Sequence, residues 1–188
     1  MKKGVLDRLV LILNKNWTPI RIKDVKKAIL LICRERAVFV DENNYELYNW
    51  EEWLKIIPEK EGISTTKGLV KIPEIVLLVE YGKIPIRAPR LTKRNIFIRD
   101  NFICQYSGER IDMKSGDKDH IIPVSQNGKS TWENMVACKK EINREKRNRT
   151  PEEAGLKLLK KPTKPKGSQL LIDPRIKMPE SWKKFIKK

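Results

Sequence analysis

The stretch "KDHIIPVSQNGKSTWENMVACKK" (118–140) constrains the fold of this chain most, because it leaves few alternatives to a β-hairpin. "KDHIIPV" alternates as a strand does and ends at a proline, and "SQNGKS" holds Asn-Gly, a strong turn signal. "MVACKK" returns as a second strand, and "EINREKRN" (141–148) has the composition of a short helix. The sequence therefore predicts a hairpin followed by a helix.

This local fold gathers polar side chains. Asp119 and His120 lie on the first expected strand and Asn134 at the start of the second, while Asn143 and Lys146 are one helical turn apart. His120 is the only histidine among 188 residues. A lone histidine is more often a surface or satisfied polar residue than a base. The argument for a catalytic role therefore depends on the spacing of its neighbours.

That spacing, DH-x13-N-x8-N, resembles the HNH motif of the ββα-metal (His-Me finger) nucleases. "LTKRNIFIRDNFICQYSG" (91–108), "TWENMVA" (131–137) and "NRTPEEA" (148–154) resemble the segments around that motif in bacterial HNH endonucleases. "LILNKNWTPIRIKDVKKAILLI" (11–32) is similar to the N-terminal region that many of these stand-alone proteins carry. The resemblance implies an α+β fold, with a ββα-metal nuclease core and a small N-terminal α+β unit.

The implied chemistry is phosphodiester hydrolysis, which needs a base to make hydroxide and a cation to neutralise the developing charge. A neutral His120 can take a proton from water. Asp119 and Asn143 offer hard oxygen ligands that suit Mg²⁺, or Mn²⁺ or another divalent ion. By resemblance, Asn134 braces the hairpin loop and orients His120, and Lys146 faces the phosphate. The alternative for Asp119 is a strand-end cap, and Asn143 could be a solvated helix residue.

The net charge of +17 indicates a polyanionic partner. Residues 139–188 alone hold 17 Lys and Arg against 6 Asp and Glu. We expect double-stranded DNA in preference to RNA. The cations expected to grip flanking phosphates are Arg94, Arg99, Lys129, Arg144, Arg147 and Arg149. Two alternatives stay open: a non-catalytic nucleic-acid-binding protein on a decayed HNH scaffold, and an RNA-directed nuclease.

Three segments are expected along the chain: an N-terminal α+β unit (1–88), the nuclease domain (89–161) and a basic C-terminal tail (162–188). "IPIRAPR" (84–90) has two prolines and predicts a linker. In the first segment we expect strands at 9–13, 37–40, 45–50 and 75–80, with 55–67 irregular. Asp24 should cap a helix whose apolar stripe includes Cys33, so that cysteine is interpreted as packing. Trp50 and Trp53 are interpreted as packing too.

Two further helices are predicted in the nuclease segment. One is capped by Thr92 and runs over 93–99, with Ile96 and Phe97 facing inward. The other begins at "TPEE" (150–153), a capping box with Pro at the first helical position, and runs to about residue 160. In the tail, "KKPTKPKGS" (160–168) indicates an extended connector, and "PESWKKFIKK" (179–188) a short amphipathic helix docked through its apolar side chains, Trp182, Phe185 and Ile186.

Many relatives brace this fold with zinc held by two Cys-x-x-Cys pairs. The corresponding positions here are Cys104 with Ser107 and Lys139 with Ile142, and Cys138 lies one position early. Ile142 cannot donate to a metal, so we predict no structural zinc. Packing by Ile142, Ile103 and Met113 is the expected replacement. A rebuilt site using Cys104, Cys138 and Glu141 is the less favoured alternative.

The apolar runs and the number of cysteines indicate the cellular compartment. No apolar run approaches the roughly 18 residues of a membrane span, and we expect no signal peptide in the first ten residues, because an acid interrupts their apolar stretch. Three cysteines are too few, and odd in number, for a disulfide framework, so we expect a reducing cytoplasm. The sequence does not give the oligomeric state, the recognised sequence or the choice between nicking and double-strand cleavage.

Overall fold

The chain folds into two compact units in the computed structural model, which describes residues 4–59, 61–66, 68–83, 89–166 and 170–186. The N-terminal unit contains residues 1–85 together with 177–188, and the nuclease unit contains residues 86–176. Most of the expected linker, residues 84–88, lies outside the described residues. No helix in the described part of the chain is long and apolar enough to cross a membrane.

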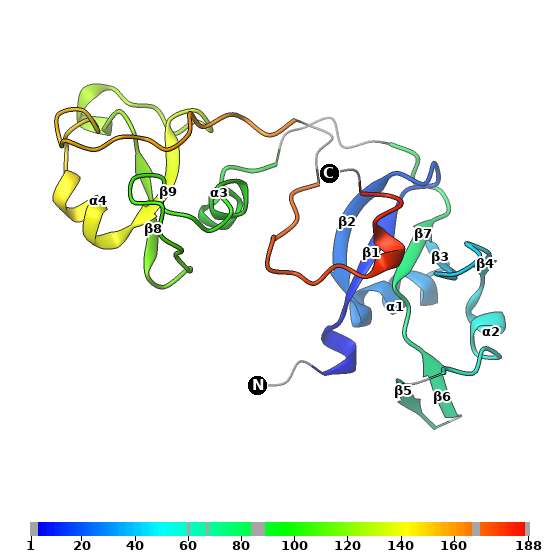
Figure 1. Cartoon of the computed structure of the whole chain (residues 1–188). Helices are drawn as coiled ribbons and strands as arrows, with labels where there is room; N and C mark the ends of the chain where they lie inside the picture. The colour runs from blue at the N-terminus through cyan, green and yellow to red at the C-terminus, as the bar shows by residue number, and fades with distance from the viewer. Residues whose placement is uncertain (1–3, 60, 67, 84–88, 167–169, 187–188) are drawn as a thin grey trace. The chain divides into compact units, whose positions relative to one another are not determined.

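A five-stranded sheet in the order β2-β1-β7-β3-β4 forms the centre of the N-terminal unit (Figure 1). Its strands are β1 (Leu9–Leu13), β2 (Pro19–Asp24), β3 (Ala37–Val40), β4 (Leu47–Tyr48) and β7 (Ile75–Leu78). The β1–β7 pair is parallel and the other pairs are antiparallel. These strands confirm the ones expected at 9–13, 37–40 and near 75–80. The strand expected at 45–50 is limited to Leu47–Tyr48, because Asn49 caps a helix that begins at Trp50, and β2 was not predicted.

Helix α1 (Val25–Cys33) covers one face of this sheet because its apolar stripe repeats at helical spacing. Asp24 caps the helix as predicted, with its side chain accepting a hydrogen bond from the Lys27 N–H at 2.8 Å. The prediction for Cys33 is wrong, because this last helical residue is exposed. Helix α2 (Trp50–Trp53) adds the fully buried Trp53, confirming its packing role.

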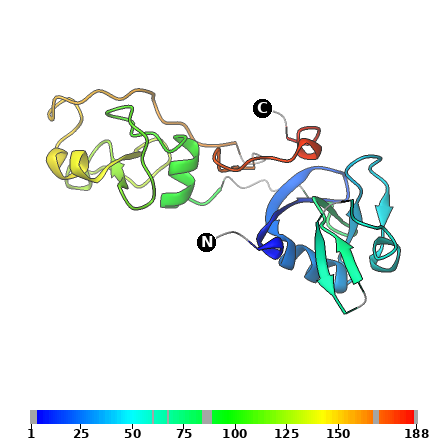
Figure 2. The same cartoon turned by 60° about the horizontal axis from the view of Figure 1, so that its bottom comes forward.

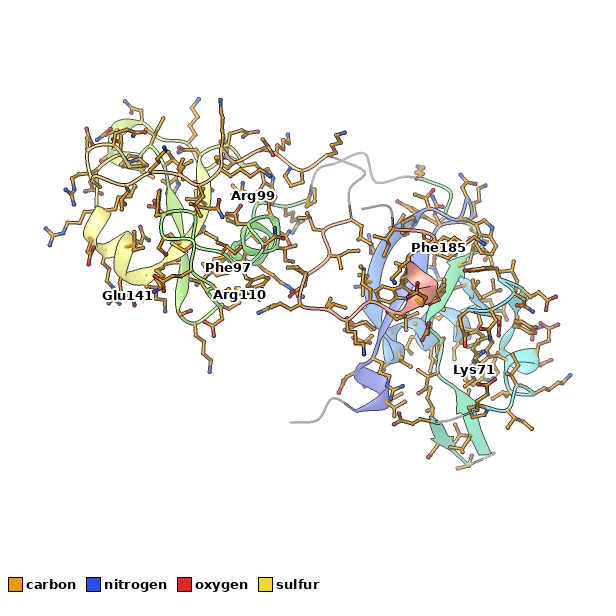
Figure 3. All side chains as sticks on the ribbon, viewed as in Figure 1. Lys71, Phe97, Arg99, Arg110, Glu141 and Phe185 are labelled. Atoms are coloured by element: carbon orange, nitrogen blue, oxygen red, sulfur yellow. The ribbon has the colours of Figure 1, made fainter. Side chains whose placement is uncertain are left out.

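The C-terminal segment belongs to the N-terminal unit. Trp182, in the 3₁₀ turn η3 (Glu180–Trp182), is fully buried and donates from Nε1 to the Glu74 carbonyl at 2.9 Å. Phe185, labelled in Figure 3, stacks on Trp17 with ring centroids 6.1 Å apart. The expected docking through aromatic side chains is therefore present, but only a single 3₁₀ turn forms, not a helix. Residues 187–188 lie outside the described part.

Two predictions on local structure are wrong in part, and a glycine lies at each difference. Residues 55–67 were expected to be irregular, yet β5 (Gly62–Thr65) pairs with β6 (Gly68–Lys71) in a hairpin (Figure 2). Gly68 has φ +122, which other residues adopt only with strain. The helix expected from residue 150 to 160 is limited to turns over 151–155, because Gly155, at φ +67, ends it after its capping box has formed.

The nuclease unit contains α3 (Lys93–Arg99), β8 (Gly116–His120), β9 (Met135–Lys139) and α4 (Lys140–Lys146). Strands β8 and β9 form an antiparallel hairpin that pairs His120 with Met135, and α4 packs against both strands. This confirms the ββα fold. Helix α3 runs over the predicted residues and buries Ile96 and Phe97. Gly116 is needed here, because a Cβ atom would lie 2.8 Å from the Phe97 ring.

Candidate active site

The strand β8 places Asp119 and His120 in different environments. Neighbouring strand residues point to opposite faces of a sheet. Asp119 accordingly lies toward α4 and is 6% exposed, while His120 is partly exposed. The carboxylate is therefore a buried charge that needs partners, and the imidazole remains within reach of solvent.

Two side chains satisfy the Asp119 carboxylate. The Lys146 ammonium on α4 lies 3.3 Å from Oδ1 and 3.1 Å from Oδ2, and it also donates to the His120 carbonyl at 2.7 Å. The Tyr106 hydroxyl donates to Oδ2 at 2.6 Å. Burial and the neighbouring carboxylate raise the pKa of Tyr106 well above its usual value, so the hydroxyl stays protonated and keeps donating.

The placement of Lys146 corrects the sequence prediction. Its side chain is fully buried, so the ammonium does not face a phosphate in solvent. Instead it joins the helix to the strand through one ion pair and one carbonyl contact. Lysine is almost never fully buried unless it is paired. Lys146 is thus an internal partner of Asp119.

Ser130 holds the imidazole of His120. Its Oγ lies 2.9 Å from His120 Nε2. Nδ1 has no hydrogen-bond partner among the residues that the structure describes. If Nε2 carries the proton and donates it to the hydroxyl, Nδ1 keeps its lone pair free to accept a proton.

Asn134 closes the long connection between the two strands. Its Oδ1 accepts from the Ile122 N–H at 2.8 Å, and its Nδ2 donates to the carbonyls of Ile122 and Lys129, each at 3.0 Å. Three hydrogen bonds from one amide fix the loop that carries Ser130. Gly128 lets the backbone of this loop come close to Ile122, because a Cβ atom at position 128 would lie 1.7 Å from the Ile122 carbonyl oxygen.

Asn143 lies on α4, one turn before Lys146, and is partly buried. Within the described residues, its side chain makes no hydrogen bond to another side chain or to the backbone. Its backbone carbonyl accepts from the Arg147 N–H at 3.1 Å, where the helix ends. The amide oxygen of Asn143 is therefore available to a ligand.

The oxygen ligands that this site offers to a divalent cation are few. A carboxylate has about four lone-pair positions, and Lys146 and Tyr106 leave part of Oδ1 of Asp119 unused. In the described chain, no three His, Cys, Asp or Glu side chains are grouped to hold a metal ion. An ion here would have to be held by the Asp119 carboxylate and an amide such as Asn143, and keep several waters. That pattern is usual for Mg²⁺.

The expected DNA-contacting cations divide into two groups. Arg94, Lys129, Arg144 and Arg147 are exposed, as a phosphate-binding role requires. Arg99, labelled in Figure 3, contradicts its predicted outward position: its side chain is 10% exposed and donates to the carbonyls of Trp132 (2.5 Å) and Met135 (2.6 Å). Arg149 is exposed, yet its guanidinium donates to two carbonyls at the end of α4.

The zinc-equivalent positions have other partners. Cys104 is buried, and its Sγ accepts from the N–H groups of Ser107 and Lys139, each at 3.4 Å. Burial and the nearby Asp119 charge raise the pKa of the Cys138 thiol above its usual value. Ile142 packs against the core, as expected. Met113 does not, because it is 40% exposed.

Sequence reasoning missed Tyr106 and Ser130. Tyr106 lies within "CQYSG", two residues after the buried Cys104, but nothing in that spacing shows that it reaches Asp119. Ser130 follows the Asn-Gly turn, and its contact with His120 depends on how the loop folds back. Both contacts join residues ten or more positions apart, so no local pattern reveals them.

Comparison with protein families gives two matches on this chain. The model described as "HNH endonuclease" matches residues 104–152, a range that includes Tyr106, Asp119, His120, Asn134, Asn143 and Lys146. The model described as "HNH endonuclease-associated, N-terminal domain" matches residues 10–86, all but the last of which lie in the N-terminal unit. None of the curated proteins matches the sequence.

Proposed function

The chain belongs to the HNH endonucleases, and from that premise we propose that it hydrolyses DNA phosphodiester bonds with the help of a divalent cation. The observation that carries the proposal is the buried Asp119 carboxylate next to a partly exposed His120 whose Nδ1 has no hydrogen-bond partner among the described residues. The net charge of +17 favours a polyanionic substrate.

In this mechanism His120 acts as the general base. Its Nδ1 takes a proton from a water molecule that attacks phosphorus, and Ser130 holds the ring in the tautomer that leaves this nitrogen free. Asn134 keeps the loop that carries Ser130 in place. A general base of this kind contributes roughly 10²–10⁴-fold to the rate.

Asp119 and Asn143 would hold the cation. Mg²⁺ or Mn²⁺ bound there would neutralise the charge that develops on the phosphate and on the leaving oxygen. Lys146 and Tyr106 fix the carboxylate in position, so their role is to orient Asp119. The exposed arginines and Lys129 would contact flanking phosphates, which position the duplex without reading its sequence.

The direct test uses supercoiled plasmid with Mg²⁺ or Mn²⁺, and compares the wild-type chain with His120→Ala. We expect nicked or linear plasmid with the wild type, a loss of cleavage in the variant, and unchanged DNA affinity in gel shifts. Absence of cleavage with any divalent ion, with binding retained, would instead support a non-catalytic binder. Cleavage of RNA but not of plasmid would support the RNA-directed alternative.

A further inference from the structure

A cavity of about 530 Å³ lies in the N-terminal unit. Every described residue in its wall belongs to that unit, and the wall is built from β1, β2, α1, β7 and the residues that follow α1 and β7. The volume is within the ~300–1,000 Å³ typical of pockets that enclose small ligands. No part of the hydrolytic mechanism above uses this cavity.

The wall of the cavity is strongly basic. Arg21 and Lys23 project from β2, Lys27 from α1, and Arg36 from the segment between α1 and β3. Glu80 is the single carboxylate among the described lining residues. Four cations facing one acid around a concave surface concentrate positive potential there and favour an anionic ligand.

Three of these cations are available to a ligand. Lys27 is held by Asp24 at 2.6 Å. Across the described residues, no carboxylate forms an ion pair with Arg21, Lys23 or Arg36. Arginine presents a planar set of donors that matches phosphate oxygens. The expected ligand of these side chains is therefore a phosphate group, and not a surface over which negative charge is spread.

The remainder of the wall is apolar and aromatic. Ile12, Ile20, Leu31 and Leu78 contribute hydrocarbon surface. Tyr81, 41% exposed, adds a ring at the same cavity. A simple inorganic anion would make no favourable contact with this apolar surface. A nucleobase has two flat apolar faces that stack on aromatic rings. The wall thus combines recognition of phosphate with recognition of a planar base.

We propose that this cavity binds one nucleotide, with its base against the apolar surface and Tyr81 and its phosphates on Arg21, Lys23 and Arg36. The choice of a nucleic-acid strand as the source of that nucleotide rests on the proposed nuclease function. A base can enter only when it is unstacked, so the N-terminal unit recognises single-stranded or locally opened DNA. A free nucleoside monophosphate presents the same chemistry.

The test measures binding of a fluorescently labelled single-stranded DNA oligonucleotide by the full chain in the absence of divalent metal. The double variant Arg21→Ala/Arg36→Ala removes two cavity cations. The matched control Lys26→Ala/Arg34→Ala removes two exposed charges from α1 and the residue after it, outside the described cavity wall. Net charge is therefore equal in the two proteins.

Each lost phosphate contact with single-stranded DNA lowers the slope of log affinity against log salt by about 0.7. We expect the cavity double variant to lower that slope by about 1.4 and the affinity by at least roughly tenfold, with a much smaller effect in the control. Tyr81→Ala should weaken binding by on the order of tenfold without changing the slope, because it removes stacking only. The proposal would be overturned if the cavity and control double variants had equal effects, or if the wild-type chain bound neither the oligonucleotide nor adenosine monophosphate.

Competition with adenosine monophosphate separates the two sources of nucleotide. Displacement of the oligonucleotide by the monophosphate, but not by inorganic phosphate, means that a free nucleotide also occupies the cavity. Displacement by neither means that only a strand does. Plasmid cleavage tests the catalytic proposal separately: if cleavage is absent while the cavity variants still lose binding, the nuclease function fails and the nucleotide site stands.

Discussion

Replacing Lys146 by methionine tests the buried ion pair most directly. Methionine has a similar length and keeps the packing, but it removes the ammonium from Asp119 and from the His120 carbonyl. Both charged side chains are almost completely buried, at 0% and 6% exposure for Lys146 and Asp119. Removing one partner of a buried pair costs about 3–5 kcal/mol, because the other charge remains desolvated and unpaired.

Hydrogen exchange of peptides that cover β8 and β9 (116–139) measures this loss locally. A destabilisation of about 3–5 kcal/mol accelerates exchange through opening of the hairpin by roughly two to four orders of magnitude. Lys139→Met is the matched control, because Lys139 in the same unit is paired with Glu109 at the surface. Exposed pairs contribute little, so exchange in the control should stay close to that of the wild type.

The double variant Asp119→Asn/Lys146→Met shows whether the unpaired charge is the cause. The amide removes the negative charge and keeps an oxygen that accepts the Tyr106 hydrogen bond. We expect the double variant to recover most of the protection from hydrogen exchange that Lys146→Met loses. If Lys146→Met exchanges no faster than the Lys139→Met control, the ammonium does not hold Asp119 and the account of the site given above is wrong.

Three further perturbations test single contacts. Ser130→Ala should lower the rate of DNA cleavage by roughly five- to tenfold, through loss of one ~1 kcal/mol hydrogen bond to His120, and leave thermal stability unchanged. Tyr106→Phe removes a donor from the Asp119 carboxylate and should destabilise the nuclease unit by about 1.5–3 kcal/mol, measured by calorimetry. Trp182→Ala should destabilise the N-terminal unit by about 3–5 kcal/mol while exchange in 116–139 stays unchanged.

Much of the fold could be predicted from the sequence because its signals are local. The caps at Asp24 and Thr92 and the alternating strands β8 and β9 depend on residues within one turn or one strand of each other. Gly155 shows the limit of such signals. A capping box predicts where a helix begins but not how far it continues, and a glycine at φ +67 ended this one after a single turn.

The sequence predicted which residues form the candidate site, but it did not predict whether their long side chains point into the protein or toward solvent. Lys146 and Arg99 are long cations that would reach either solvent or the interior with equal ease. Each points toward buried acceptors: the Asp119 carboxylate for Lys146, and for Arg99 the adjacent Asp100 carboxylate together with the Trp132 and Met135 carbonyls. Apart from Asp100, those acceptors lie 27 or more positions away along the chain. In a chain with 41 basic residues, the buried acceptors therefore determine which cations pack inside the nuclease unit. The exposed cations stay available to the proposed nucleic-acid substrate.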